Sequence, residues 1–217
     1  SIRRQRQMCI RDRYLYDELD KREIPIVIME PLQGGRLANP AESVVNRLKE
    51  RDPKASLASW AFRFVGSYPR ILTVLSGMVY QEHLEDNLRT FKDFKYLTDE
   101  EKEFLGTEIA GIMASFPTIN CNDCKYCMPC PYGVDIPGIF KHYNECVNEG
   151  EIAQSTEQEN YRKLRRAYLV SYDRAIPSVR QANHCIGCKQ CIEHCPQSIS
   201  IPRCLLYTSP SPRDRTR

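Results

Sequence analysis

Apolar residues in the first half of the chain fall into two short continuous runs, separated by longer segments in which apolar and polar positions alternate at helical spacing. The runs IPIVIM (24–29) and ILTVL (71–75) are rich in β-branched residues, and turn sequences follow each of them. Continuous apolar runs of this length predict buried strands of a parallel sheet. Two strands cannot by themselves form a stable sheet covered on both faces, so the pattern predicts part of a larger α/β domain.

Helical patterns occupy the segments around these strands. The pair Asn39-Pro40 predicts a helix that continues to about Glu50, and Asp52-Pro53 predicts the start of another over residues 56–65. The second of these carries an apolar face at helical spacing, formed by Leu57, Trp60, Ala61 and Phe64. We also expect helices over residues 81–91 and, from the capping box that begins at Thr98, to about residue 114.

The second half is predicted to be mainly helical. Ile136-Pro137 predicts a helix that Gly150 ends, and residues 157–172 predict a second. The apolar face of that second helix consists of Tyr161, Leu164, Tyr168 and Leu169. The fold class is therefore α/β and then mainly α, with the change at about residue 115.

Composition narrows the function classes. Of 217 residues, 31 are Lys or Arg and 28 are Asp or Glu, so the charge is nearly balanced. The excess of positive charge lies in residues 1–13 and 204–217, so we predict no nucleic-acid partner from it. The chain has no apolar run of membrane-spanning length, which predicts no membrane span.

The two basic ends differ from the rest of the chain. RQMCIRDR, within residues 1–13, and CLLYTSPSPRDRTR (204–217) resemble translated sequencing-adapter sequence. On this interpretation both ends are artefacts, Cys9 and Cys204 are not native, and the chain is a fragment of a longer protein.

Cysteine carries the clearest chemical signal. Eight of the 11 cysteines lie in two tracts, Cys121-x2-Cys124-x2-Cys127-x2-Cys130-Pro and Cys185-x2-Cys188-x2-Cys191-x3-Cys195-Pro. The second is the bacterial ferredoxin spacing, in which three cysteines hold one [4Fe–4S] cluster and the fourth ligates the other. We therefore predict two clusters. One is held by Cys121, Cys124, Cys127 and Cys195, and the other by Cys185, Cys188, Cys191 and Cys130.

Other interpretations of the cysteines stay open. Because the first tract is one residue shorter, Cys130 could instead ligate the cluster of its own tract. Structural zinc, redox-active disulfides and buried free thiols compete with the clusters, although four thiols crowded into each tract suit a cubane better. We interpret Cys146 as a small apolar core residue, and we expect His184 and His194 to flank the ligands without binding iron.

The first half also resembles a known family. MEPLQGGRLANP and SLASWAFRFVGSYPRILTVLSGMVYQEHLEDNL are similar to the last two β/α units of the aldo/keto reductases, in the branch with a C-terminal iron–sulfur domain. The resemblance implies a TIM barrel, of which residues 14–115 form the end, followed by a ferredoxin-type domain at 116–203. It implies NADP or NAD as cofactor in the intact protein and a small carbonyl-type substrate.

The same resemblance implies nucleotide contacts on the loops after the strands and on the next helix. The matching positions are Leu32, Gln33, Gly34, Ser76, Gly77, Met78, His83, Asp86 and Asn87. His83 stands where the family usually has Arg or Lys. The catalytic Asp, Tyr, Lys and His of the family precede these units, so we expect the parent to be an enzyme and this fragment to be inactive.

The cysteine tracts resemble those of α-helical ferredoxins. CP-x-G-x-D-I-P (130–137) and CP-x-S-I-S-I-P (195–202) form an internal repeat, and we expect the helix after the second copy to be missing. The predicted function is an iron–sulfur oxidoreductase that passes electrons to or from a partner protein or flavin. The alternatives are a non-catalytic electron-transfer module and purely structural clusters. Unprotected cysteine tracts predict a reducing cytoplasm.

Overall fold

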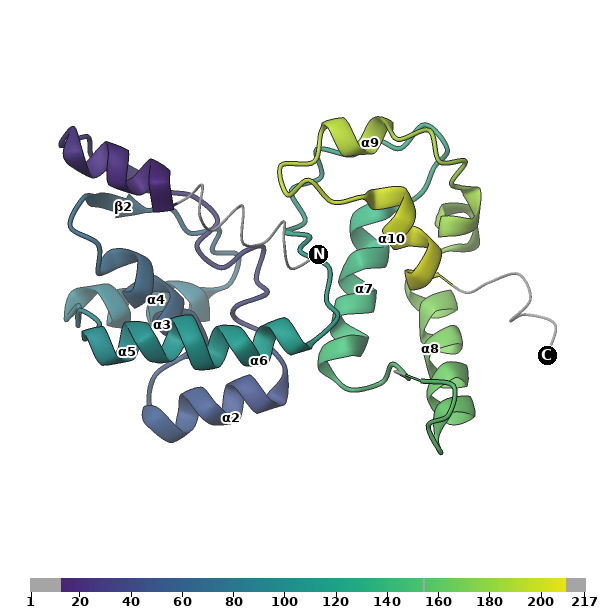
Figure 1. Cartoon of the computed structure of the whole chain (residues 1–217), viewed down its shortest axis with the longest axis horizontal. Coiled ribbons are helices and arrows are strands. Elements are labelled where there is room, and N and C mark those ends of the chain that lie inside the picture. Colours follow the sequence, from purple (N-terminus) through teal and green to yellow (C-terminus); the bar gives the residue numbers. More distant parts are fainter. Residues whose placement is uncertain (1–12, 154, 210–217) are drawn as a thin grey trace.

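The computed structural model describes residues 13–153 and 155–209. The chain forms an N-terminal part, with a small sheet and the helices α2 to α6, and a C-terminal part with the helices α7 to α10, and these lie side by side (Figure 1). Residues 13–21 are helical and precede the sheet. Within the described part of the chain, no helix is long and apolar enough to cross a membrane.

The two predicted strands pair in parallel. β1 (Ile26–Ile28) lies beside β2 (Ile71–Val74), with Ile26 opposite Ile71 and Ile28 opposite Val74. The expectation that both strands are buried is wrong for the described residues, because Val27 is 47% exposed and Leu72 is 70% exposed. The fold is therefore mainly helical, with a two-stranded parallel sheet that is open on one side, and the barrel stays a prediction.

Of the next three helices in the N-terminal part, two lie between β1 and β2 along the chain and one follows β2. They are α2 (Glu42–Arg51), α3 (Leu57–Gly66) and α4 (Gln81–Lys92). α2 begins later than predicted, since its N-cap is Ala41 and no side chain caps it.

The start of α3 also differs from the prediction. Asp52 caps the preceding turn, where its carboxylate accepts from the backbone N–H groups of Lys54 and Ala55. Ser56 is the N-cap, and its hydroxyl accepts from the N–H of Ser59 at 3.0 Å. A serine hydroxyl satisfies a donor that the first helical turn leaves free, so this residue sets the helix start.

A long composite helix ends the N-terminal part. It consists of α5 (Asp99–Glu103), the π-helical segment η1 (Phe104–Ile109) and α6 (Ala110–Ser115). The predicted capping box is confirmed, since Thr98 and Glu101 bond each other's backbone N–H groups. This helix packs over α2 and α3, and the core between them contains Val44, Leu48, Trp60, Leu97, Phe104 and Ile109.

Two long helices form the frame of the C-terminal part. α7 (Ile136–Asn148) starts at the predicted Ile-Pro, and the Asp135 side chain accepts from the N–H of Gly138 at its N-cap. α8 (Tyr161–Ala175) begins four residues later than the predicted start at residue 157 and packs against α7. Short helices follow: η2 (Ser178–Arg180), η3 (Ala182–His184), α9 (Gln190–Glu193) and α10 (Ile201–Thr208).

The expectation that no helix follows the second Ile-Pro is wrong. α10 begins at Ile201-Pro202 and packs on α7, because its apolar residues complete the same core. Leu205 is 2% exposed, and the carbonyl of Thr208 accepts from the buried hydroxyl of Tyr168 at 2.5 Å. The adapter interpretation of residues 204–217 stays a prediction, and Cys9 lies outside the described residues.

Candidate metal centres

Both cysteine tracts lie on the core formed by α7, α8 and α10. The loops that carry them cross over one end of α7, and the short helix α9 contains Cys191, the third cysteine of the second tract (Figure 1). Seven of the eight cysteines are partly buried and Cys188 is exposed. All ten cysteines in the described part of the chain are free thiols, so no disulfide joins the tracts there.

The two tracts have the same local backbone. The second and fourth residues after the first cysteine are left-handed in both, at Asp123 and Lys125 in one tract and at Gly187 and Lys189 in the other. Left-handed residues turn the chain sharply, which lets a short loop present three thiols around one centre. The predicted internal repeat is therefore present in the fold of the loops.

The repeat continues beyond the fourth cysteine. Gly133 and Ser198 each follow that cysteine by three residues, have positive φ and donate their N–H to its carbonyl, at 2.9 and 3.0 Å. α7 and α10 then begin at equivalent Ile-Pro pairs. The extra residue of the second tract lies between its third and fourth cysteines, so the difference in length leaves this exit turn unchanged.

The thiols of the two tracts are interleaved. Burial is the main cause that raises the pKa of Cys121, and electrostatic interactions with Cys124 of its own tract and with Cys195 of the other raise this pKa further. Cys191 interacts with Cys185, Cys188 and Cys130, which lies in the first tract. Each fourth cysteine is therefore a neighbour of the opposite tract.

Burial and neighbouring thiols favour the protonated form of Cys121, Cys127 and Cys191. Burial is the main cause that raises the pKa of Cys127 to about 12 and of Cys191 to about 11, and neighbouring thiols add to it. A buried set of thiolates requires compensating positive charge, which iron supplies. Metal ligation therefore fits the donor set, and loading must release protons.

One buried polar side chain holds the peptide in front of each tract. The Asn144 side chain on α7 accepts from the N–H of Ile119 at 2.7 Å and donates to its carbonyl at 2.8 Å. The Tyr172 hydroxyl on α8 accepts from the N–H of Ala182 at 3.1 Å. The sequence interpretation missed both. Their signal is a polar group on the buried face of each helix, where an unpaired group is costly.

The other candidate residues near the tracts are Cys146, His184 and His194. Cys146 is 3% exposed in the core, and its Sγ lies 3.6 Å from Nε2 of His142. His184 and His194 are exposed, and Nε2 of His184 lies 3.1 Å from the carbonyl oxygen of Ser178. Among the described residues, no group of three or more His, Cys, Asp or Glu is arranged around a single metal ion.

The predicted nucleotide positions divide into two groups. Ser76 and Asn87 are brought together by a hydrogen bond of 3.1 Å, and Asp86 bonds the Ser56 hydroxyl and Arg89. Gly77, Met78 and His83 are exposed near them. Leu32, Gln33 and Gly34 form a loop that turns toward the first cysteine tract, where Gly34 packs on Asn122.

Comparison with known proteins gives one match. No curated protein and no solved structure is significantly similar to the chain. Residues 120–200 match the family described as the 4Fe-4S dicluster domain. This range begins one residue before Cys121 and ends five residues after Cys195, so it contains both tracts. The C-terminal part of this chain thus contains a 4Fe-4S dicluster domain that binds two [4Fe–4S] clusters for electron transfer.

Proposed function

We propose that the chain is the electron-transfer end of an oxidoreductase and that each cluster takes three ligands from one tract and the fourth from the other. The observation that carries this proposal is that Cys130 lines one cavity together with Cys185, Cys188 and Cys191 of the other tract. The electrostatic interaction of Cys195 with Cys121 agrees with it. Each cluster supplies reversible one-electron chemistry when bound. The protein residues bring the two sites close together and shield most of the thiols from water.

The crossed ligand set predicts which cluster each substitution damages. Cys195→Ser removes a ligand from the cluster of the first tract, and Cys130→Ser removes one from the cluster of the second. We expect each variant, reconstituted anaerobically, to retain one intact [4Fe–4S] signal by Mössbauer and electron paramagnetic resonance spectroscopy. Cys146→Ser is the control, because this thiol lies in the core outside both tracts.

Local ligation by Cys130 predicts a different result. In that case Cys130→Ser damages the cluster of its own tract, and the double variant Cys124→Ser, Cys130→Ser loses one cluster only. With crossed ligands the same double variant damages both clusters. Zinc bound without acid-labile sulfide in the wild-type chain contradicts the iron–sulfur proposal altogether.

The second tract supports exchange of electrons with a partner protein or flavin. Cys188 is exposed, and the neighbouring Ile186 is 64% exposed. Tyr126, which is 68% exposed, lines the same cavity as Cys185 and Cys188. An apolar rim around an accessible ligand lets a redox partner approach the cluster closely. Purely structural clusters predict instead that reduction by dithionite is irreversible or destroys the cluster, which a repeated reduction and oxidation cycle measures.

In the N-terminal part, the order of strands and helices along the chain is the feature that supports an intact protein of the aldo/keto reductase type. Two neighbouring parallel strands each lead into a loop at the same edge of the sheet, which is where α/β enzymes bind nucleotides. We propose NADP or NAD binding there in the intact protein, within a reducing cytoplasm. Fluorescence titration of NADPH against the longer protein tests this. Binding unchanged by Asn87→Ala contradicts the assigned contacts.

A further inference from the structure

The loop after β1 reaches across to the first cysteine tract. Its Gly34 has φ +67°, and a Cβ atom at this position would lie 2.3 Å from the carbonyl oxygen of Asn122. Only a residue without a side chain allows such an approach. A second contact between the parts follows, since the Asn148 amide donates to the carbonyl of Asn39 at 3.2 Å. The N-terminal part is therefore fitted to the peptide that carries Cys121.

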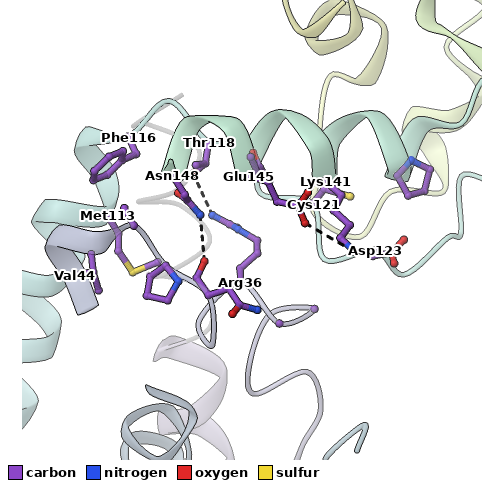
Figure 2. A pocket seen from close by; sticks show the side chains of 17 residues that line it. Arg36, Val44, Met113, Phe116, Thr118, Cys121, Asp123, Lys141, Glu145 and Asn148 are labelled. Atoms are coloured by element: carbon purple, nitrogen blue, oxygen red, sulfur yellow. Dashed lines mark hydrogen bonds and ion pairs between the residues drawn. The ribbon is translucent and has the colours of Figure 1, made fainter. Parts of the chain in front are cut away.

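Arg36 extends from this loop into the space between the two parts. Its guanidinium donates to Oγ1 of Thr118 at 3.3 Å (Figure 2). It also donates to Oδ1 of Asn120, the residue directly before Cys121, at 2.9 Å. Arg36 and Cys121 line the same cavity of about 260 Å³. Burial lowers the pKa of Arg36, and the charge of Cys121 opposes this change.

The other charges in this cavity are already paired. Lys141 lies 4.0 Å from Glu145, and Lys125 lies 3.9 Å from Asp123. Within the described residues, Arg36 makes no ion pair with a carboxylate, and its two partners are a neutral amide and a neutral hydroxyl. Its positive charge is therefore not neutralised by a carboxylate and can interact with negative charge on the sulfur of Cys121.

We propose that Arg36 positions the first cysteine tract and raises the reduction potential of the cluster that this tract holds. The inference rests on the two-cluster function. A nearby cation favours the state with more negative charge, and reduction adds one negative charge to the cluster. Because Arg36 is half-buried, water and salt screen this effect only weakly. A residue outside the matched dicluster domain thus tunes one of its two clusters.

Potentiometric titration with dithionite, followed by electron paramagnetic resonance, tests the inference on the full chain. We expect Arg36→Met to make reduction of one cluster at least tenfold less favourable, a fall of about 59 mV for one electron, and to leave the other cluster unchanged. Arg36→Lys keeps the charge and should retain most of the potential. The shift should be the same at low and high salt.

Two glycine variants provide a matched pair that leaves Arg36 in place. Gly34→Ala forces the loop away from Asn122, whereas Gly35→Ala introduces a comparable left-handed strain at φ +90° with no atom within 4 Å of the new Cβ. We expect Gly34→Ala to lower the potential of the same cluster as Arg36→Met does, and Gly35→Ala to have little effect. This pair decides the question if Arg36→Met fails to hold iron.

Three results would overturn the inference. They are equal shifts in both clusters, an unchanged potential in Arg36→Met, and equal potentials in the two glycine variants. Iron and sulfide counts separate these results from failure of the two-cluster function. A wild-type chain that binds no cluster removes the function itself, whereas a fully loaded Arg36→Met with wild-type potentials removes only the role of Arg36.

Discussion

Replacing Asn144 by alanine should release the peptide in front of the first cysteine tract. The Asn144 side chain is 7% exposed and makes two hydrogen bonds to the backbone of Ile119, which is 4% exposed. The alanine variant leaves the buried N–H of Ile119 without a partner, whereas the Ile119 carbonyl loses one of its two donors and still accepts from the N–H of Cys121 at 2.8 Å. The unpaired N–H costs about 1–3 kcal/mol and the second lost hydrogen bond about 0.5–1.5 kcal/mol, so we expect a loss of about 2–4 kcal/mol.

Urea unfolding of the reconstituted chain, followed by cluster absorbance and circular dichroism, measures this loss. With a slope of about 2 kcal/mol per molar urea, the midpoint should fall by about 1–2 M. Asn148→Ala is the control, because it removes one bond from a partly exposed asparagine one turn further along α7, and should change stability by no more than about 0.5 kcal/mol. Equal midpoints for the two variants would refute the reasoning.

Three further predictions follow from the described contacts. Tyr172→Phe removes the acceptor for the Ala182 N–H and should cost about 1–3 kcal/mol by urea unfolding, and an unchanged midpoint would show that this bond does not hold the second tract. Thr98→Ala removes the capping box and should cost about 1 kcal/mol, with a loss below about 0.3 kcal/mol contradicting its role. Burial lowers the pKa of His142 against the opposing effects of Glu145, Glu151 and Glu149, so the folded state binds a proton less readily than the unfolded one. The stability that His142 contributes is therefore complete above its unfolded pKa of about 6.5 and is lost as the pH falls below that value. His142→Gln should flatten the dependence of the free energy of unfolding on pH, and the same slope of this free energy against pH in both proteins would contradict the prediction.

The repeat between the two cysteine loops was the most predictable part of the molecule. Cluster geometry constrains residue type, spacing and the turn after the fourth cysteine, so local sequence carries most of the information. The two loops indeed share left-handed positions at Asp123 and Gly187. The ends of helices were less predictable, because several polar residues compete for the cap. Ser56 caps α3 and Asp52 caps the turn before it, although the sequence pattern favoured Asp52 for the helix.

Long-range contacts could not be predicted from one sequence. Asn144 and Tyr172 act on peptides 25 and 10 residues away, and their roles depend on how α7 and α8 face the loops. The approach of Gly34 to Asn122 likewise depends on the packing of two parts of the chain. The absence of a helix after Ile201 was predicted for a different reason. Residues 204–217 were interpreted as foreign sequence, whereas Leu205 in this segment is buried in the same core as Ile201.

The central claim is that the two tracts hold two cubane clusters, and the composition of the loaded protein tests it most directly. The full chain is reconstituted anaerobically with iron and sulfide, and iron, acid-labile sulfide and zinc are counted per chain beside Mössbauer spectra. Two clusters predict about eight iron and eight sulfide, with [4Fe–4S] signals only. Zinc without sulfide, or four iron with one intact tract, would contradict the claim.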